Sequence, residues 1–276
     1  MTLRRSILLI PVLLLLLMGG RHMAAAHKQE LKRLFEQGQS HTEFLAAATH
    51  RKEMWDRNTA TPTVLQLVTF RFLPGHTEAA LAIYRNDALP LYRQNQDMVQ
   101  FRAYREVESP VPLDLMVVSR FRGMQGMDAS NESLRELAAL AGTSMGALYG
   151  AISDHAAGHT DEFVTLLPGL GTGAHASRLT AFIRYRIVPG KQERFETLLR
   201  EHVAPWEARN GVSSETGRFL VSDGWDYLRM ISFSDLHGYE TWWRAMHALD
   251  VQDELEAITS RRQEIILGTL TDFSVR

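Results

Sequence analysis

The chain has 276 residues, a formal net charge of −2 at pH 7 and no cysteine. This length can bury one large hydrophobic core or two small ones, and the lack of cysteine excludes disulfide bonds, thiol catalysis and thiolate metal sites. The weakly acidic balance offers no electrostatic basis for binding nucleic acid or an anionic membrane.

The first 26 residues have the pattern of an export signal. Arg4 and Arg5 precede an apolar run that ends at Met18, and three alanines at 24–26 form a small-residue cleavage site. The run is shorter than the roughly 20 residues that cross the hydrocarbon core of a membrane, which favours a cleaved signal over a retained anchor. Cleavage would remove three arginines and no acidic residue, so the net charge would become −5. The sequence therefore predicts a periplasmic or secreted protein with no membrane contact after cleavage.

Residues 27–62 are predicted to form an N-terminal helical extension. Leu31, Leu34 and Phe35 lie at helical spacing there. One or two helices that pack on the rest of the protein or on a partner explain this pattern, and a solvated spacer is the alternative.

Two long segments further along the chain repeat each other. The sequence TFRFLPG at 69–75 recurs as RYRIVPG at 184–190, and the match continues at an offset of 115 residues. After a gap of three residues, an offset of 112 aligns Asp114 with Asp226. Agreement that keeps its order over such a length indicates a duplicated domain. The predicted boundaries are 63–168 for the first repeat, 169–178 for a glycine-rich linker and 179–276 for the second repeat.

Each repeat contains the same order of predicted elements. In the second repeat, a strand at 180–188 ends at Pro-Gly, and a helix with an apolar stripe from Phe195 to Trp206 follows. Two short strands come next, then a helix containing Trp242 and Trp243, then a last strand. The order βαββαβ predicts an α+β fold, in which a ferredoxin-like antiparallel sheet carries helices on one face.

The prolines late in the first helices, Pro90 and Pro205, are predicted to kink or stop them. Strand alternation turns Phe70 and Tyr185 toward the helices and leaves a mixed, arginine-bearing face on the other side of each sheet. Two such faces can close on each other, so we expect an intrachain α/β-barrel with a ligand-sized cavity or a packed core between the sheets.

Several short motifs stand out in the repeats. They are the Pro-Gly turn between strand and helix, the proline late in that helix, Arg71 and Arg186 on the first strands, the sequence His202-x-x-Pro205, and the pair Trp242-Trp243. Together these motifs resemble the dimeric α/β-barrel superfamily over residues 64–276, and within it NIPSNAP-type proteins. That superfamily includes cofactor-independent monooxygenases, haem-degrading and haem-binding enzymes, isomerases, cyclases and proteins without known activity, so the resemblance alone does not assign a function.

Three arginines are candidate ligand-binding residues. Arg71, Arg184 and Arg186 fall on the face of the first strands that is predicted to point into the barrel. Guanidinium groups in a partly closed space would bind a carboxylate, an enolate or a phosphate. The alternatives are internal salt bridges, or a strand face with all three arginines in solvent.

His202 is the candidate catalytic residue. It lies in the apolar stripe of its helix, four residues after Leu198 and four before Trp206, which is an unusual place for a group that titrates near neutral pH. Such a histidine can act as a general base or as an axial haem ligand. The alternative is a hydrogen-bonded residue at the helix edge.

Two further motifs predict no site. His155 and His159 have a spacing that can hold a metal on a helix, but Gly158 indicates that the helix ends there. The sequence PGLGTG at 168–173 resembles a phosphate-binding loop, yet a strand rather than a helix follows it. We therefore predict no metal ion and no bound cofactor.

The combined prediction is an exported tandem ferredoxin-like protein that encloses a small-molecule cavity between its repeats. In the leading hypothesis it is a ligand-binding or weakly catalytic barrel, oxygenase-like or isomerase-like, in which an arginine holds an anionic oxygen and His202 moves a proton. The alternatives are a haem-handling protein that uses His202 or another histidine as ligand, and a non-catalytic interaction module. A homo-oligomer is left open.

Overall fold

The computed structural model describes residues 62–110, 112–173 and 177–275. These residues belong to one compact unit. The predicted export signal and, apart from Pro62, the predicted N-terminal extension lie outside the described residues. None of the described helices combines the length and the hydropathy that a membrane crossing needs.

The two repeats contain the same series of elements. The first repeat consists of β1 (Thr63–Phe72), α4 (Thr77–Ile83), the π-helical turn η1 (Tyr84–Ala88), α5 (Leu89–Gln94), β2 (Met98–Glu108), β3 (Leu115–Arg122), α6 (Gly123–Leu140), α7 (Met145–Ser153) and β4 (Ala156–Leu166). The second consists of β5 (Leu179–Ile187), α8 (Gln192–Leu198), the π-helical turn η2 (Leu199–Val203), α9 (Ala204–Arg209), β6 (Ser213–Val221), β7 (Tyr227–Phe233), α10 (Leu236–His247), α11 (Gln252–Ala257) and β8 (Thr259–Val275).

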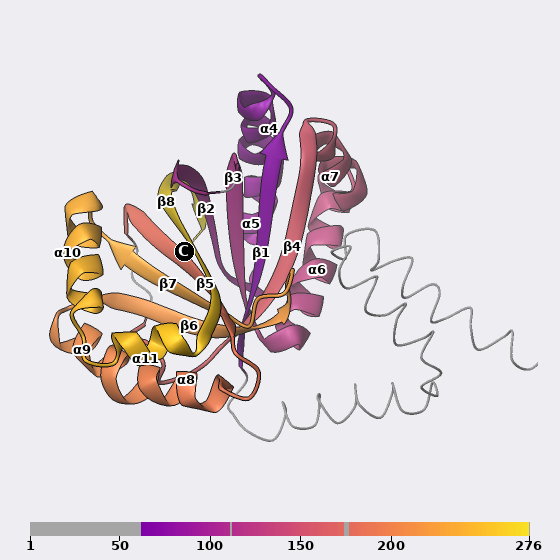
Figure 1. The fold of residues 1–276 in the computed structure, drawn as a ribbon. Helices are drawn as coiled ribbons and strands as arrows, with labels where there is room; N and C mark the ends of the chain where they lie inside the picture. The colour runs from indigo at the N-terminus through magenta and orange to yellow at the C-terminus, as the bar shows by residue number, and fades with distance from the viewer. Residues whose placement is uncertain (1–61, 111, 174–176, 276) are drawn as a thin grey trace, which may run out of the picture. The chain divides into compact units, whose positions relative to one another are not determined.

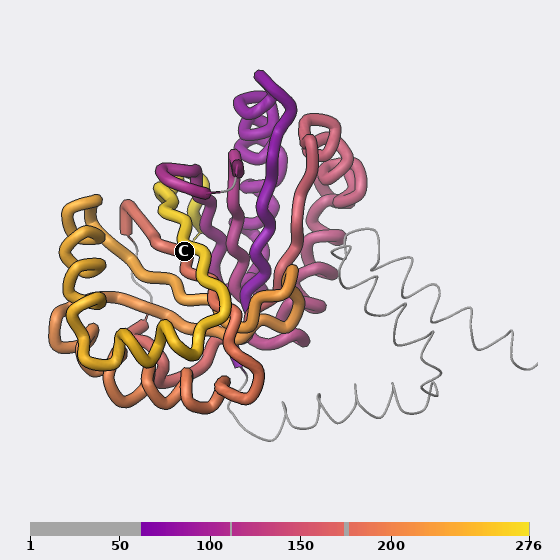
Figure 2. Tube along the Cα trace, viewed as in Figure 1, coloured from indigo at the N-terminus to yellow at the C-terminus, as the bar shows by residue number. Residues whose placement is uncertain are grey.

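The strands form a closed antiparallel barrel in the order β1-β3-β2-β8-β5-β7-β6-β4, and β4 pairs back onto β1. The repeats are joined twice, because β2 pairs with β8 and β4 pairs with β6. Figure 1 shows the helices of each repeat on the outer face of its own strands. Figure 2 traces the same two halves, the first from indigo to pink and the second from orange to yellow. The predicted fold class, tandem ferredoxin-like repeats that close an α/β-barrel, is confirmed.

The Pro-Gly turns of the two repeats have the same geometry. Gly75 and Gly190 have φ angles of 81° and 83°. The residue after each glycine donates its N–H to the carbonyl three residues earlier, at 2.9 and 3.0 Å. Proline at the second position and a glycine with positive φ at the third are the requirements of a type II turn. The equivalence predicted for these two turns is therefore confirmed.

The aligned pair Asp114 and Asp226 makes the same contacts in both repeats. Oδ2 of Asp114 accepts the N–H of Phe72 at 2.8 Å, and Oδ2 of Asp226 accepts the N–H of Ile187 at 2.7 Å. The backbone N–H of each aspartate donates at 2.9 Å to the same first strand, at the carbonyl two residues before Phe72 or Ile187. Each carboxylate thus satisfies the last N–H of the first strand, where the sheet ladder ends.

Neither Pro90 nor Pro205 stops its helix, since α5 and α9 continue beyond them. Instead, a π-helical turn lies before each proline. The N–H of Leu89 bonds to the carbonyl five residues earlier, and so does the N–H of Ala204. Proline cannot donate an N–H, and its ring crowds the carbonyl four residues back, so the preceding turn widens.

The interior of the barrel is a packed core. Phe182 and Tyr104 meet edge to face across the two repeats, with ring centroids 5.2 Å apart. The predicted small-molecule cavity between the sheets is therefore wrong, because the inward side chains of both repeats are large enough to fill the space. These side chains are Leu65, Leu67, Tyr104, Leu113, Met116, Val118, Val164, Phe182, Leu228, Met230, Ile265 and Leu267.

Candidate functional site

A pocket of about 290 Å³ lies on the helix side of the second repeat, between β5, β7 and β8 and the helical segments α8, η2, α10 and α11. This volume is close to the lower end of the roughly 300–1,000 Å³ of small-molecule sites. We call this space the helix-side pocket. Its apolar wall consists of Phe195, Leu199, Trp242, Met246 and Leu255, and its polar lining of Tyr185, Arg229, His247, Gln252, Glu256, Thr259, Ser260, Arg261 and Arg262.

Arg229, which lines the helix-side pocket, belongs to a buried ion pair. Arg229 on β7 donates to both carboxylate oxygens of Glu207 on α9, at 2.7 Å each. The two side chains are 1% and 0% exposed. A charge so far from water is tolerated when its partner and its hydrogen bonds are complete, and a two-bond contact between guanidinium and carboxylate meets that condition.

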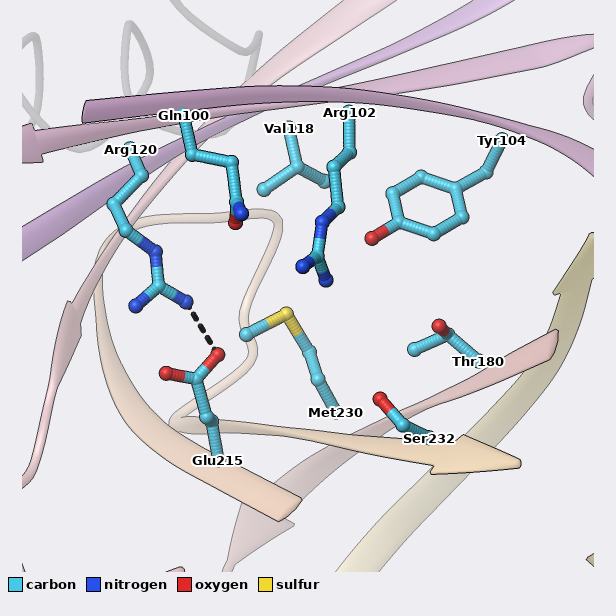
Figure 3. Close-up of a pocket in the computed structure, with 9 residues that line it drawn as sticks. All are labelled: Gln100, Arg102, Tyr104, Val118, Arg120, Thr180, Glu215, Met230 and Ser232. Atoms are coloured by element: carbon cyan, nitrogen blue, oxygen red, sulfur yellow. Dashed lines mark hydrogen bonds and ion pairs between the residues drawn. The ribbon is translucent and has the colours of Figure 1, made fainter. Parts of the chain in front are cut away.

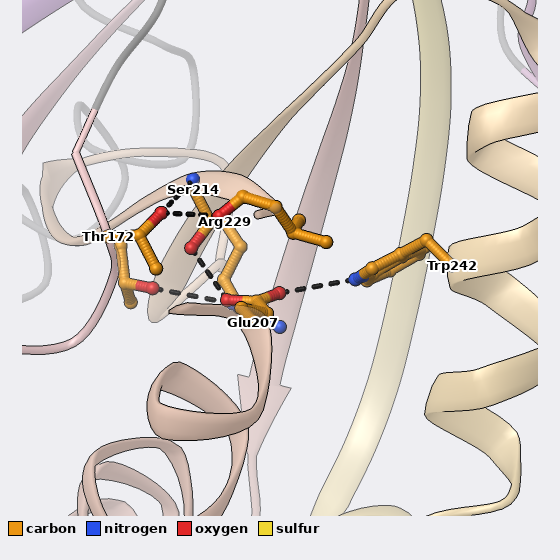
Figure 4. Close-up of polar contacts among 7 residues, drawn as sticks. Thr172, Glu207, Ser214, Arg229 and Trp242 are labelled. Atoms are coloured by element: carbon orange, nitrogen blue, oxygen red, sulfur yellow. Dashed lines mark hydrogen bonds and ion pairs between the residues drawn. The ribbon is translucent and has the colours of Figure 1, made fainter. Parts of the chain in front are cut away.

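The surrounding side chains satisfy the remaining lone pairs of Glu207 (Figure 4). Trp242 Nε1 donates to Oε1 at 3.2 Å, and Ser214 Oγ donates to Oε2 at 2.6 Å. The backbone N–H of Ser214 in turn donates to Thr172 Oγ1 at 2.9 Å. The network joins α9, α10 and β6 to the linker, so it holds in place the elements that surround the pocket.

Arg229 remains a cation in this environment. Burial alone would lower the pKa of its guanidinium, but the charge and the hydrogen bonds of Glu207 outweigh that effect, and the pKa is raised. The positive charge of Arg229 is paired with Glu207, so it does not act on the pocket as an isolated cation.

Tyr185 on β5 lines the helix-side pocket together with Arg229. The hydrogen bonds of Arg229 go to Glu207 and Thr216. A guanidinium group has donors and no acceptor, so the Tyr185 hydroxyl cannot donate to Arg229. The hydroxyl hydrogen of Tyr185 is consequently directed to another acceptor, and a ligand in the pocket can supply it.

The corresponding positions of the first repeat lack these polar groups. Alignment places Val117 where the second repeat has Arg229, and Tyr92 where it has Glu207. Phe70 occupies the position of Tyr185. All three first-repeat side chains belong to one continuous hydrophobic core between the sheet and its helices. The duplicated fold therefore carries the polar network in the second repeat alone.

Arg184 is the member of the predicted arginine set that lies inside the barrel. It donates to Glu162 at 2.5 Å and to Gln263 at 3.1 Å, and both members of the ion pair are buried. Burial raises the pKa of Glu162, and the charge of Arg184 lowers it only in part. The internal salt bridge, which the sequence left as an alternative, is the arrangement in the structure.

Arg71 and Arg186 are exposed near the ends of β1 and β5. The three arginines therefore do not line one cavity. The reason is the packed barrel core. Arg184 fits inside it as part of an ion pair, whereas Arg71 and Arg186 lie near the strand ends, beyond the apolar side chains that fill the interior.

A small space of about 20 Å³ does remain in the barrel, large enough for roughly one water molecule. Figure 3 shows side chains of both repeats facing each other across it, with an ion pair between Arg120 and Glu215 at 2.5 Å. Its size excludes an organic ligand. Polar side chains of β2, β3, β5, β6 and β7 line it, together with Val118 and Met230.

His202 is exposed and does not line the helix-side pocket. The expectation that it lies within the apolar stripe is wrong, because the π-helical turn η2 contains it. A π-turn holds one more residue than an α-turn, so the buried side of the helix moves along the sequence, and Val203 is buried instead. Its predicted catalytic role receives no support from this position.

His155 and His159 do not share a helix either. Helix α7 ends at Ser153, and His159 lies in strand β4. His155 Nδ1 instead lies 2.9 Å from Nδ1 of His76. In the part of the chain that the structure describes, no three histidine, aspartate or glutamate side chains come together as a metal site.

Sequence reasoning missed Tyr185, Glu207 and Arg229. One signal was present, since Arg229 is the one charged residue in the strand 227–233 and Glu207 follows the apolar stripe of its helix. Two opposite charges at positions expected to be buried indicate an internal pair. What the sequence did not show is that these two charges meet, or that a pocket lies beside them.

Comparisons with known proteins bear on the fold. No protein-family model matches the chain, and no curated protein matches it. A protein assigned as a monooxygenase from Fusobacterium nucleatum has a similar structure, with a TM-score of 0.58 at 10% identity, over 77% of this chain and 94% of that one. A chlorite dismutase variant from Candidatus Nitrospira defluvii gives a TM-score of 0.53 at 12% identity, over 80% and 95%. An anthrone oxidase-like protein gives 0.51 at 7%, over 76% and 92%.

The fold is that of the dimeric α/β-barrel proteins. Here both halves of the barrel come from one chain. Identities this low establish a shared fold, and an activity has to be argued from the site.

Proposed function

We propose that the helix-side pocket of the second repeat binds a small, flat, mostly apolar molecule and that Tyr185 donates a hydrogen bond to an oxygen atom of that molecule. The position of Tyr185 carries this proposal, because its phenol lines the pocket beside Arg229, and a guanidinium group cannot accept the hydroxyl hydrogen. The aromatic and aliphatic side chains that line the same pocket favour a planar, apolar body.

The arrangement supports chemistry on an enolate or a phenolate. A hydroxyl donor in a partly enclosed pocket stabilises negative charge as it develops on oxygen. An isomerase-like step needs only a proton transfer next to such an oxygen, whereas an oxygenase-like step also consumes molecular oxygen. The similar fold of the assigned monooxygenase and of the anthrone oxidase-like protein is consistent with this class of substrate. The NIPSNAP-type assignment is a proposal that rests on the short sequence motifs.

Substitution Tyr185→Phe tests the site with two ring systems of similar shape, 2-naphthol and naphthalene. We expect the affinity for 2-naphthol to fall about tenfold, in line with the loss of one hydrogen bond of about 1.4 kcal/mol. Naphthalene, which has no oxygen, should bind equally well to both proteins. Fluorescence titration measures both affinities.

The matched control is Tyr149→Phe on α7 of the first repeat, which lies away from the helix-side pocket and should change neither affinity. If Tyr185→Phe lowered the affinity for 2-naphthol and for naphthalene equally, the phenol would act through packing rather than hydrogen bonding. If the unaltered protein binds neither probe, the interaction-module alternative becomes the better account.

Haem is the cofactor that the sequence left as an alternative. One feature suits it: His247 lines the helix-side pocket, and its Nδ1 lies 2.8 Å from the carbonyl of Trp243. Nδ1 must therefore donate, which leaves Nε2 as the ring nitrogen with a lone pair. The volume does not suit it, because a space of about 290 Å³ is small even for a drug-sized ligand and haem is larger than most such ligands. We derive no step that involves haem.

We also propose that the protein is exported, on the strength of the charged, apolar and small-residue segments within residues 1–26. N-terminal sequencing of protein from a fractionated native host should give a chain that begins near His27. Recovery of the chain with Met1 intact from the soluble cytoplasmic fraction would contradict export.

A further inference from the structure

Two histidines of the first repeat meet beside its Pro-Gly turn. His76 follows that turn and precedes α4, and His155 lies between α7 and β4. Their Nδ1 atoms are 2.9 Å apart, and their ring centroids are 5.1 Å apart. Both residues are partly buried. The rings therefore direct their Nδ1 atoms at each other, and one Nδ1–H donates to the other Nδ1.

Backbone hydrogen bonds hold both histidines in place. The carbonyl of His155 accepts the N–H of Leu73 at 2.8 Å, and the carbonyl of Leu73 accepts the N–H of His76 at 2.9 Å. The N–H of His155 donates to the carbonyl of Ile152 at 3.1 Å, and the carbonyl of His76 accepts the N–H of Ala80 at 3.0 Å. Both side chains thus start from fixed backbone positions, and the two imidazoles stay within reach of each other.

The spacing of the two nitrogens suits two ligands of one transition-metal ion. Metal–nitrogen bonds of roughly 2.0–2.1 Å place two ligands about 2.9 Å apart at a right angle and about 3.4 Å apart at a tetrahedral angle. The right-angled arrangement is that of Cu²⁺ or Ni²⁺, and copper binds nitrogen ligands most tightly among the divalent first-row metals. A metal ion would replace the shared hydrogen after each ring turns about its Cβ–Cγ bond.

Acidic residues flank the histidine pair. Asp154 precedes His155 and is exposed. Asp114 accepts the hydroxyl of Thr77, the residue that follows His76, at 3.4 Å. Negative charge near the two imidazoles favours the approach of a divalent cation.

We propose that His76 and His155 bind a divalent transition-metal ion, with Cu²⁺ preferred and water in its remaining coordination positions. Among the residues that the structure describes, no third histidine, aspartate or glutamate joins the pair. The bound ion is therefore exchangeable, unlike an ion enclosed by four protein ligands. The site is independent of the helix-side pocket, whose lining belongs to the second repeat.

The second repeat has the same backbone contacts without the ligands. The N–H of Val188 donates to the carbonyl of Ile258 at 2.8 Å, and the carbonyl of Val188 accepts the N–H of Lys191 at 3.0 Å. Lys191 and Ile258 thus occupy the places of His76 and His155. An ammonium group and a hydrocarbon side chain offer no lone pair to a metal, so the site is specific to the first repeat.

The test is calorimetric titration of the full chain with Cu²⁺ alone. The chain has 11 histidines, some of them outside the described residues, so the readout is the change that each substitution makes. We expect His76→Ala and His155→Ala each to weaken one Cu²⁺ site by about tenfold or more. His237→Ala, at an exposed position of α10, is the matched control and should leave Cu²⁺ binding unchanged. Circular dichroism verifies the fold of each variant.

Electron paramagnetic resonance of the Cu²⁺ complex gives a second readout. The unaltered protein should show splitting from two imidazole nitrogens that is lost in both histidine variants. Identical Cu²⁺ affinity and identical spectra in the unaltered protein and both variants would show that the pair forms a hydrogen bond only, and would overturn the proposal. Zn²⁺ should bind more weakly at the same pair, and tighter binding of Zn²⁺ would overturn the assignment to copper.

Discussion

Substitution Arg229→Ala is expected to lower the free energy of unfolding by about 3–5 kcal/mol, because it leaves the Glu207 carboxylate buried without its counter-ion. Both side chains are almost completely inaccessible to water, and the bond between them has two short contacts. Trp242 and Ser214 keep their hydrogen bonds to Glu207, but neither supplies a positive charge. Urea denaturation followed by circular dichroism measures the loss.

Two further variants make this prediction specific. Arg244→Ala removes an exposed ion pair with Glu240 on α10 and should cost no more than about 0.5 kcal/mol. Replacing both partners, Glu207→Leu with Arg229→Met, should cost less than Arg229→Ala alone, because no buried charge is left without a partner. If the double variant is the less stable of the two, the ion pair contributes more than mutual neutralisation, and this explanation is wrong.

Substitution Phe182→Ala should also be severely destabilising, by about 3–5 kcal/mol, the usual range for removing a buried phenylalanine from a packed core. Phe182 is 0% exposed inside the barrel and packs against Tyr104. The loss has two sources, the hydrophobic surface that is no longer buried and the cavity that remains. Urea denaturation again provides the measurement.

This second prediction discriminates between a packed barrel and a ligand-binding one. Leu140→Ala, at an exposed helix position, is the control and should change stability by less than about 0.5 kcal/mol. A loss below about 1 kcal/mol for Phe182→Ala would indicate an interior that is not tightly packed. Binding of 2-naphthol should survive in the folded fraction, since Phe182 does not line the helix-side pocket.

The duplication explains why one half of the protein can carry a site while the other half supports it. Both repeats keep the same turn, the same aspartate contacts and the same π-helical turn. Those features involve backbone groups, so they do not depend on which side chains fill the core. The cores themselves differ, with Val117 and Tyr92 in the first repeat where the second has Arg229 and Glu207. A polar network has thus been accommodated within an unchanged backbone frame.

The sequence by itself determined the features that depend on neighbouring residues. Pro-Gly defines the turns because only glycine adopts the required positive φ without strain, and strand alternation directed Phe70 and Tyr185 toward the helices. The internal repeat indicates that each predicted element occurs twice, and few sheet arrangements are compatible with the order βαββαβ. These signals are short-range, and for that reason they could be identified without the structure.

Only the tertiary structure decided which charges meet and where space remains. Arg184 pairs with Glu162 of the other repeat, and Arg229 pairs with Glu207 of a neighbouring helix, so both contacts depend on how separate elements pack. The position of His202 depended on a π-turn that shifts the buried side of a helix by one residue. A pocket is the volume that side chains from several strands and helices fail to fill, and that quantity depends on all of them together.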